Sequence, residues 1–405
     1  MTETLTSAGV VSGPRLLRYV DGDTSLATHL DRYGPLPPLT RRELQEAADQ
    51  VALRGRGGAG FPFARKLEAV GSASGAPTVV VNVSEGEPAS LKDATLALLA
   101  PHRVLDGAET CARALRVHTV HLVVPAENPP VEQSLLRAVE ERTHDPHRSW
   151  RLRWRLHRAS PWFVAGQARA VIELMSGRAN LPVTGWRPEA YTGYRGRPTL
   201  LSNAETYAHV GEIVRHGAEE YAALGTPDEP GTALLTLRGD GEHPQVVEVP
   251  YGTAWDEVLT SEELAGPVLL GGYHGTWAVA GELAGARVSR SALQGAGLTL
   301  GAGVVLPVRG CPLRRTRQVV GYLAGQSAGR CGPCRNGLPA LAEALRDLDA
   351  GHGGTQRTQQ LLRLVSGRGA CAHPDGTARL VASLLRSWPD EPALHASGGC
   401  SAVAA

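Results

Sequence analysis

Residues 54–66 read Arg-Gly-Arg-Gly-Gly-Ala-Gly-Phe-Pro-Phe-Ala-Arg-Lys, and the run Thr78-Val-Val-Val-Asn82 follows shortly afterwards. Glycines in the first stretch allow the backbone to approach a ligand closely, with N–H groups aimed at a phosphate and no Cβ in the way. The second stretch is a short β-branched run, which is typical of a strand buried in a parallel sheet. The two together favour an α/β fold that binds a nucleotide phosphate.

Both lysines of the chain lie in this part of the sequence. Lys66 and Lys92 stand against 39 arginines among 405 residues. Where arginine is used nearly everywhere else, a retained ammonium indicates a task that needs a compact point charge. The net charge of +1 gives no sign of a nucleic-acid or anionic-membrane partner.

The first 228 residues alternate strand and helix signals, as βαβ units do. We predict a helix over 106–115, a buried strand over 118–124, a helix over 131–141 and a one-sided strand over 150–156. This order predicts a layered, Rossmann-like α/β domain over residues 1–228.

The pattern changes after residue 228. Strands are predicted at 232–237, 246–249, 268–270 and 303–306, with a turn at 239–241 and a helix over 254–259. These short elements predict a small β-rich domain over residues 229–308. Helical leucine spacing from Leu338 to Leu348, and again from Leu380 to Trp388, predicts a helical domain over residues 309–405.

The six cysteines cluster toward the end of the chain. Four of them fall between residues 331 and 405, two as the pair Cys331-x-x-Cys334. No signal peptide is evident and no apolar run is long enough to cross a membrane, so we expect a cytoplasmic protein without a direct membrane span. In that setting the cysteines favour metal or redox ligation over disulfides. Cys111 lies in an apolar helix and is expected to be a small core residue.

A second motif, Asn82-x-x-Glu85-x-Glu87-Pro88, follows directly on the buried strand. Ligands in α/β sheets bind at the carboxyl ends of strands, which is where this motif is expected to lie. A phosphate-binding loop beside a pair of carboxylates suits a flavin mononucleotide with a dinucleotide above it.

These motifs resemble those of the NADH- and flavin-binding subunit of respiratory complex I, a family shared with NAD-linked hydrogenases and formate dehydrogenases. The matching blocks are Gly55–Pro62, Asn82–Asp93, Pro101-His102 and Pro198–Thr206. The resemblance covers nearly the whole chain. It implies FMN, NADH and an iron–sulfur cluster as cofactors, a β-grasp-like (SLBB type) middle domain, and a C-terminal helical bundle that carries the iron–sulfur loop.

The resemblance also implies which residues bind. Glu85 and Glu87 become the candidate catalytic residues, and Phe61 with Glu87 is expected to receive NADH. The cofactor-binding residues that it implies are Gly55, Arg56, Gly57, Gly58, Gly60, Phe61, Lys66, Asn82, Ser84, Glu85, Glu87, Gly166, Ser202, Asn203 and Thr206.

The chain departs from the family pattern at several of these positions. The family aspartate after Asn82 is Ser84, one of two adjacent asparagines is Ser202, and two glutamates are replaced by Gln167 and Ala168. Three carboxylates are therefore missing near the expected nicotinamide pocket. The residues expected at the phosphate site keep the family pattern, whereas those expected at the NADH site do not.

The iron–sulfur loop departs in the same way. The family pattern resembles S-C-G-x-C-x-x-C-R with a later fourth cysteine, but Ala328 replaces the first cysteine, which leaves Cys331, Cys334 and Cys371. A [4Fe–4S] cube normally takes four thiolates. Three outcomes are open: a three-iron cluster, a cube whose fourth ligand is not a thiolate, with His373 as the nearest candidate, or no cluster at all or zinc bound by the three cysteines and His373.

The resemblance implies an electron-entry subunit of the NADH dehydrogenase type. A hydride would pass from NADH to FMN, and single electrons would then pass to the cluster and on to other redox subunits or a ferredoxin-like acceptor. Such a subunit is expected in the cytoplasm, peripheral to the membrane through its partners. The alternatives are a non-catalytic homologue with a scaffold or assembly role, and a flavin reductase that lacks the cluster.

Overall fold

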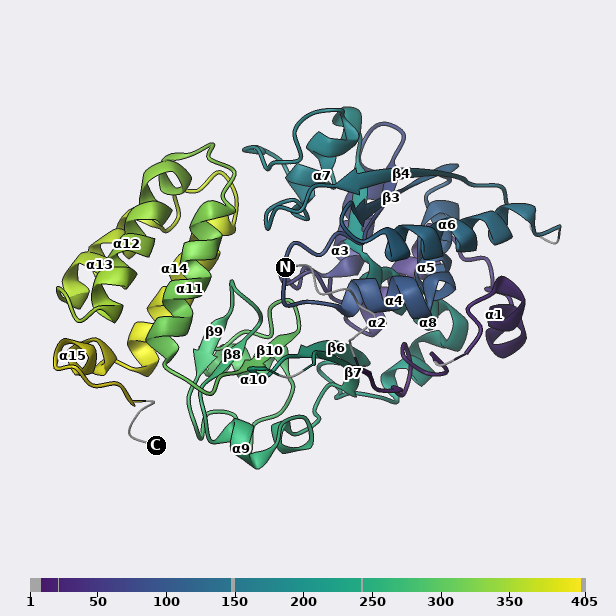
Figure 1. Ribbon diagram of the computed structural model, residues 1–405. Helices are drawn as coiled ribbons and strands as arrows, with labels where there is room; N and C mark the ends of the chain where they lie inside the picture. The colour runs from purple at the N-terminus through teal and green to yellow at the C-terminus, as the bar shows by residue number, and fades with distance from the viewer. Residues whose placement is uncertain (1–8, 21, 147–149, 242, 402–405) are drawn as a thin grey trace.

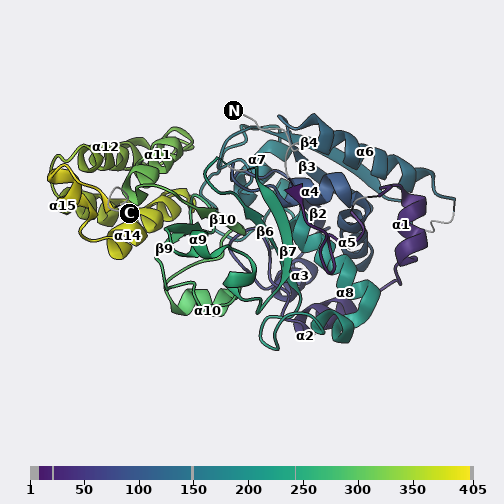
Figure 2. The same ribbon diagram turned by 60° about the horizontal axis from the view of Figure 1, so that its bottom comes forward.

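A computed structural model describes residues 9–401, apart from residues 21, 147–149 and 242. Helices surround a parallel sheet on one side of the molecule, and a separate cluster of helices forms the other side (Figure 1). A mixed sheet lies between these two regions when the molecule is turned (Figure 2). The chain thus runs through three regions in sequence order.

The parallel sheet has four strands in the order β4-β3-β2-β5. Their bounds are β2 Thr78–Asn82, β3 Thr119–Pro125, β4 Arg153–Ala159 and β5 Thr199–Asn203. Strands β2 and β5 are buried along their whole length, which explains their uninterrupted apolar character. Strand β4 is an edge strand whose arginines are exposed. The predicted strands at 78–82 and 118–124 are confirmed, and the one expected over 150–156 begins only at Arg153.

Eight helices of the described residues belong to this region. They are α1 Leu26–Tyr33, α2 Arg41–Gln50, α3 Phe63–Ser72, α4 Lys92–Leu99, α5 Pro101–Ala114, α6 Pro129–His144, α7 Ala168–Met175 and α8 Ala204–Ala222. The helix predicted over 106–115 is the later part of α5, which starts at Pro101 because proline suits the first helical position. Helices α5 and α8 touch at Gly107, where a Cβ would lie 1.8 Å from the backbone oxygen of Tyr207.

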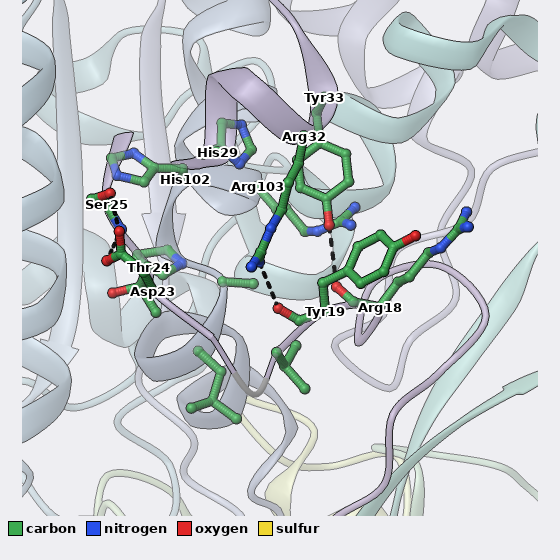
Figure 3. A pocket seen from close by; sticks show the side chains of 14 residues that line it. Arg18, Tyr19, Asp23, Thr24, Ser25, His29, Arg32, Tyr33, His102 and Arg103 are labelled. Atoms are coloured by element: carbon green, nitrogen blue, oxygen red, sulfur yellow. Dashed lines mark hydrogen bonds between the residues drawn. The ribbon is translucent and has the colours of Figure 1, made fainter. Parts of the chain in front are cut away.

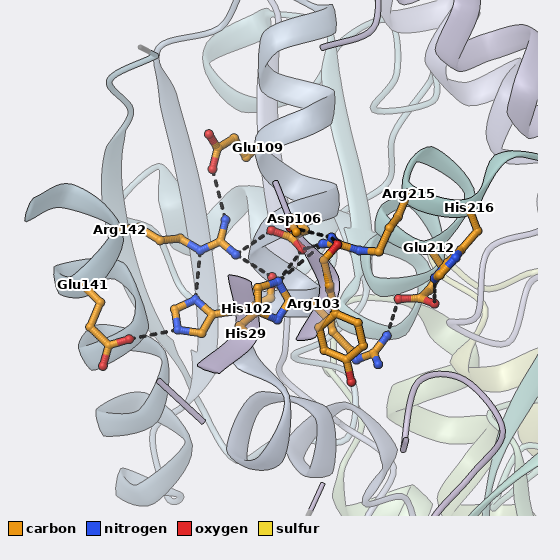
Figure 4. A network of polar contacts seen from close by, with 12 residues as sticks. His29, His102, Arg103, Asp106, Glu109, Glu141, Arg142, Glu212, Arg215 and His216 are labelled. Atoms are coloured by element: carbon orange, nitrogen blue, oxygen red, sulfur yellow. Dashed lines mark hydrogen bonds and ion pairs between the residues drawn. The ribbon is translucent and has the colours of Figure 1, made fainter. Parts of the chain in front are cut away.

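A buried polar network joins α1, α5, α6 and α8 (Figure 4). The carboxylate of Asp106 accepts hydrogen bonds from Arg142 and Arg215, both at 2.6 Å, and lies 2.8 Å from Nε2 of His29. Burial raises the pKa of Asp106, but the two guanidinium groups and the hydrogen bond from His29 outweigh it and hold that pKa well below its usual range. Four helices are thereby tied to one charged side chain.

The mixed sheet has six strands in the order β1-β7-β6-β10-β8-β9. Their bounds are β1 Gly9–Val10, β6 Thr232–Leu237, β7 Gln245–Pro250, β8 Val268–Leu270, β9 Thr276–Ala278 and β10 Val304–Pro307. The predicted hairpin is confirmed, because β6 and β7 pair antiparallel. Strand β1, from the other end of the chain, pairs in parallel with β7.

The prediction of a helix over 254–259 is wrong. Only a single 3-10 turn forms at Trp255–Glu257, since Thr260 adopts an extended backbone and caps a new helix, α9 (Ser261–Leu264). The buried side chains of Trp255 and Leu259 enter the core of the mixed-sheet region instead. A further helix, α10 (Arg290–Gly295), precedes β10.

The last region is helical, as predicted. Its helices are α11 Pro312–Gly325, α12 Leu338–Asp349, α13 Thr355–Val365, α14 His373–Ser387 and α15 Glu391–Ala396. Most of the leucines that predicted α12 and α14 are buried in one apolar cluster with Trp277 of β9, and Leu338 is buried in a smaller cluster with Val365 and Ala378. Among the described residues, none of the helices is both long enough and apolar enough to cross a bilayer.

Candidate functional site

A cavity of about 620 Å³ lies where the three regions meet. Such a volume is in the usual range for small-molecule and cofactor sites. All fifteen residues predicted to bind cofactors line this one cavity, from Gly55 in the first glycine loop to Thr206 in α8. Residues 54–66, 82–93 and 198–206 are far apart in the sequence, and the parallel sheet brings them together at one edge.

The glycine loop forms a closed turn at one wall of the cavity. Arg54 and Pro62 form a β-bridge, and the N–H of Gly55 donates to the carbonyl of Phe61 at 2.9 Å. Gly58 and Gly60 have φ angles of +94° and +62°, a backbone conformation that favours glycine. The loop conformation therefore depends on these two residues.

Gly57 differs from Gly58 and Gly60, and its surroundings indicate whether the loop has room for a ligand. Its φ is not in the left-handed region, and a Cβ added there would meet no protein atom within 4 Å. Neither backbone strain nor packing against the protein thus requires glycine at this position. Because Gly57 lines the cavity, a side chain there would occupy space that is otherwise open to a ligand.

Two cations stand beside this loop. The buried Arg56 donates its backbone N–H to the hydroxyl of Thr206 at 2.9 Å, and its guanidinium contacts the hydroxyl of Tyr251. Its Nε atom is buried without an acceptor in the part of the chain that the structure describes. Nζ of Lys66 donates to the carbonyl of Leu201 at 3.0 Å. Lys66 also pairs with Glu189 at 3.4 Å, so its charge is partly compensated at this end of the cavity.

The second lysine, Lys92, supports the cavity wall through buried ion pairs, which its position in the sequence did not indicate. Lys92 is 3% exposed, and its Nζ lies 2.7 Å from Glu205 and 3.2 Å from Asp93. Burial lowers the pKa of Lys92, but the neighbouring carboxylates outweigh it and raise that pKa above its usual value. Asp93 in turn accepts two hydrogen bonds from Nδ2 of Asn203, both at 3.0 Å. Lys92 thus holds the carboxylate that orients a cavity asparagine.

The ends of β2 and β5 place two asparagines side by side, since Asn82 and Asn203 are paired in the sheet register. Nδ2 of Asn82 donates to the carbonyl of Gly166 at 2.8 Å, and its Oδ1 accepts from the hydroxyl of Ser84 at 2.5 Å. A carboxylate in place of Ser84 could not make this donation. The serine that departs from the family pattern is therefore used locally, in the turn itself.

The turn after β2 packs directly against residues 162–166. A Cβ at Gly86 would lie 2.2 Å from the carbonyl oxygen of Phe163, and one at Gly166 would lie 2.6 Å from that of Ser84. Two glycines, one on each segment, thus allow backbone to touch backbone. The contact fixes two walls of the cavity relative to each other.

Two half-buried glutamates face the cavity from this turn. Glu85 accepts from the hydroxyl of Ser90 at 2.6 Å, and Glu87 accepts from the N–H of Tyr273 at 2.7 Å. Burial raises the pKa of Glu85 from 4.5 to about 7, with a further rise caused by Asp93, and burial raises the pKa of Glu87 to about 7 as well. Both carboxyls can therefore change protonation state near neutral pH.

The iron–sulfur loop approaches the same cavity. Cys331 and Cys334 are in side-chain contact, and Cys371 is close enough to influence the Cys334 thiol and to contact the side chain of Gln167. Burial raises the pKa of Cys334 to about 12. Ala372, the next residue after Cys371, lines the cavity wall. Cys371 thus adjoins the cavity through Ala372 and Gln167, and the other two thiols lie next to Cys371.

Among the described residues of this loop, no side chain provides the fourth ligand that a [4Fe–4S] cube needs. Ala328 packs against the apolar cluster of the helical region. His373 is fully buried, with Nδ1 3.0 Å from Nε2 of His274 and Nε2 2.9 Å from the carbonyl of Leu323. Both ring nitrogens are occupied, so the structure does not support His373 as the fourth ligand. Nor do the three cysteines and His373 form a group compact enough for one zinc ion, as a group elsewhere among the described residues does.

The walls that the later regions contribute were not predicted from the sequence. Gly271, His274, Thr299 and Gly301 of the mixed-sheet region line the cavity, as does Arg379 of α14. The only local signals were the glycine pairs at 271–272 and 301–303. Nothing in the spacing of these residues indicated that they would face the loop at 54–66.

A second hollow, lined by residues of α1, α5 and the segment before α1, is much smaller (Figure 3). Its volume is about 30 Å³, which is room for a single water. Asp23, Ser25 and Arg32 at its rim are hydrogen-bonded to one another or to the backbone. This hollow cannot hold a nucleotide.

Comparisons with known proteins agree with this geometry. Residues 48–212 match the family model described as the Nuo51 FMN-binding domain, and residues 314–395 match the NADH-ubiquinone oxidoreductase-F iron-sulfur binding region. The chain is 29% identical to an NADH-quinone oxidoreductase subunit of Rhizobium meliloti, over 88% of this chain and 89% of that protein. It is 28% identical to an NADH-quinone oxidoreductase subunit of Mycobacterium tuberculosis, over 95% of this chain and 94% of that protein.

A solved structure shares the fold. A chain of an NAD⁺-reducing [NiFe]-hydrogenase in the H₂-reduced state superposes with a TM-score of 0.82 at 26% identity, over 94% of this chain. The match spans 66% of the hydrogenase chain, which is therefore longer. Two family models that together cover more than half of the sequence, and a shared fold, place the chain in the family of NADH- and FMN-binding flavoprotein subunits of complex I and of NAD-linked hydrogenases.

Proposed function

We propose that the chain is an NADH:acceptor oxidoreductase subunit that admits electrons from NADH through FMN to an iron–sulfur cluster. The observation that carries this proposal is the continuity of the cavity. One space runs from the glycine loop at residues 55–61 past Glu87 to Ala372, which adjoins Cys371. The glycine loop and the residue next to Cys371 therefore line the same cavity.

The residues have separate parts in this proposal. The N–H groups of Gly57 and Gly58, together with Arg56 and Lys66, would bind the FMN phosphate. Asn82 and Asn203 would contact the flavin, while Phe61 and Glu87 would receive NADH. Hydride and one-electron chemistry belongs to the cofactors, so the side chains bind, orient and exclude water.

The cluster is proposed to have three cysteine ligands from the chain, Cys331, Cys334 and Cys371. Ala328 and the occupied nitrogens of His373 leave no fourth protein ligand in the loop. This donor set fits a three-iron cluster, or a cube whose fourth iron is held by a small exogenous ligand.

The boundaries of the three domains are proposed at 1–228, 229–308 and 309–405. We infer that the middle one is a β-grasp-like domain of the SLBB type, because the parallel pair β6 and β10 lies at the centre of its mixed sheet. Strand β1 joins that sheet from the first domain. The relatives are named as subunits, so other redox subunits or a ferredoxin-like acceptor are the proposed partners, with peripheral attachment to the cytoplasmic face of a membrane through them.

The visible spectrum of the purified full-length chain, prepared anaerobically, tests the function. Flavin bands with a broad iron–sulfur shoulder, both bleached by NADH, are expected. Flavin without the shoulder would support a flavin reductase that lacks the cluster, which Ala328 favours. A colourless protein that takes up neither cofactor on reconstitution would support a non-catalytic scaffold.

Gly57→Leu tests the phosphate loop directly. The leucine would occupy space that only a ligand uses, so flavin content should fall at least about tenfold, which corresponds to about 1.4 kcal/mol of binding. Gly321→Leu is the matched control, because Gly321 lies in α11 and its Cβ also meets no protein atom within 4 Å. Equal flavin content in both variants would exclude the loop from the phosphate site.

A further inference from the structure

Four potential metal ligands converge at the end of the helical region, away from the cavity. Cys311 lies directly before α11, Glu391 and His395 lie on α15, and Cys400 follows α15. Within the part of the chain that the structure describes, this is the one group of at least three such side chains whose ligand atoms all lie within 4.8 Å of one another. Cys311, Glu391 and His395 are buried, and Cys400 is half-buried.

The distances between these ligand atoms are close to the edges of a coordination tetrahedron, although slightly shorter. Sγ of Cys311 lies 3.2 Å from Nε2 of His395 and 3.3 Å from Oε1 of Glu391. The same carboxylate oxygen lies 3.2 Å from Nε2 of His395 and 3.1 Å from Sγ of Cys400. Zinc binds such ligands at about 2.0–2.3 Å, so neighbouring ligand atoms are separated by roughly 3.3–3.8 Å.

The ring of His395 is oriented so that one nitrogen points at the other side chains of the group. Nδ1 lies 2.9 Å from the backbone carbonyl of Asp349, which can only accept, so Nδ1 carries the proton of the neutral ring. Nε2 then presents its lone pair to the oxygen of Glu391 and the sulfur of Cys311. These electron pairs repel each other unless a proton or a metal ion lies between them. A carbonyl that accepts from Nδ1 is also the usual arrangement behind a metal-bound histidine.

The sulfur of Cys311 faces the N-terminus of a helix. Cys311 is the N-cap of α11, and the backbone N–H of Arg314 points at its sulfur at 3.3 Å. A helix N-terminus stabilises a negative charge, and the thiolate is the form that binds metal. On the other side, the N–H of Ser401 lies 3.3 Å from both carboxylate oxygens of Glu391.

We propose that Cys311, Glu391, His395 and Cys400 bind a structural zinc ion. Two thiolates, an imidazole and a carboxylate are a donor set suited to zinc, and four protein ligands leave no open position for substrate. The ion would tie α15 and the chain that follows it to the start of α11 (Figure 1). The site shares no residue with the cavity and does not depend on the proposed function.

Metal analysis of the full-length protein, expressed with zinc supplied and purified without chelators, tests the proposal. About one equivalent of zinc per chain is expected. Cys311→Ser and His395→Gln should each lose it. Cys334→Ser should keep it, and this control separates the new site from zinc that enters the iron–sulfur loop. Cys111→Ala, which removes a buried thiol elsewhere, is the matched cysteine control.

X-ray absorption at the zinc edge should show two sulfur ligands at about 2.3 Å and two nitrogen or oxygen ligands. Cys400→Ser keeps the test decisive if the buried variants fail to fold, because Cys400 is half-buried and close to the end of the chain. Absence of zinc from the zinc-supplied protein, a Cys311–Cys400 disulfide in its place, or loss of zinc in Cys334→Ser but not in Cys400→Ser would overturn the proposal.

Discussion

Glu87 connects two regions of the molecule through one side chain. It follows β2, lines the cavity, and accepts a hydrogen bond from the backbone of Tyr273 in the mixed-sheet region. Because burial brings its pKa to about 7, the group is present both as carboxylate and as acid at neutral pH. At the proposed NADH site, Glu87 would therefore offer both a negative charge and a proton donor.

Glu87→Gln should raise the KM for NADH about tenfold, the equivalent of one hydrogen bond to a charged group, about 1.4 kcal/mol. Steady-state kinetics with NADH and an artificial acceptor measures this. The flavin content should stay at the wild-type level, since the change lies away from the phosphate loop. An unchanged KM would remove Glu87 from the NADH site.

Ala328 decides what kind of cluster the loop can hold. Ala328→Cys should supply the missing thiolate and raise the iron content from about three to about four per chain. Iron and acid-labile sulfide analysis, with EPR of the oxidised protein, distinguishes the two clusters. Ala328→Ser is the control at the same position. If the wild type already contains a complete cube, the cysteine variant will not differ from it.

Among the elements, α1, α5, α6 and α8 pack around Asp106 and bury a group of charged side chains inside the first region. The two arginines that pair with Asp106 are themselves buried, so removal of the carboxylate would leave them without this compensation. The network explains why arginine, with its planar fork of donors, stands at positions 142 and 215.

Asp106→Asn should therefore lower the free energy of unfolding by about 3–5 kcal/mol. Denaturant unfolding followed by circular dichroism measures it. Glu132→Gln is the matched control, because Glu132 pairs with an Arg158 side chain that is 64% exposed, and such surface pairs contribute only about 0–1 kcal/mol. A similar loss in both variants would show that burial does not strengthen the Asp106 network.

Elements with strong local periodicity could be predicted from the sequence. The strands at 78–82, 232–237 and 268–270 have the predicted bounds, because β-branched and apolar runs of this length have few alternatives. The segment after Ala254 could not, since an extended Thr260 divides it and only tertiary packing of Trp255 decides that. Strand β1 is two residues long and forms only because β7 offers it an edge.

At the scale of the whole molecule, the cavity could be predicted only in part. The glycine loop and the turn after β2 carry their chemistry in short motifs, so their residues were found. The walls at Gly301 and Arg379 come from contacts between regions, which a local pattern does not encode. The group of Cys311, Glu391, His395 and Cys400 could not be predicted for the same reason, because Cys311 and Cys400 lie near opposite ends of the sequence of the helical region.

Glu85 and Glu87 also predict how stability depends on pH. Their folded pKa values of about 7 lie above the ordinary 4.5, so the folded state binds more protons between these values and loses stability as the pH rises through them. Glu87→Gln cannot ionise. In flavin-free protein, its free energy of unfolding relative to that of wild type should therefore increase from about pH 5 to about pH 8, by up to about 1.4 kcal/mol per pH unit. The difference in melting temperature between the two proteins follows this change. A pH-independent difference would contradict the raised pKa.

Two walls of the cavity are formed by residues in the last part of the sequence, and this has a consequence for biosynthesis. Residues 299–302, 372 and 379 complete the enclosure, although the glycine loop leaves the ribosome much earlier. A nascent chain that still lacks about its last hundred residues has a cavity that is open on one side, because the residues that form these walls have not yet been synthesised. A chain that ends before residue 299 is therefore expected to lack these walls and to bind flavin more weakly than the full-length protein.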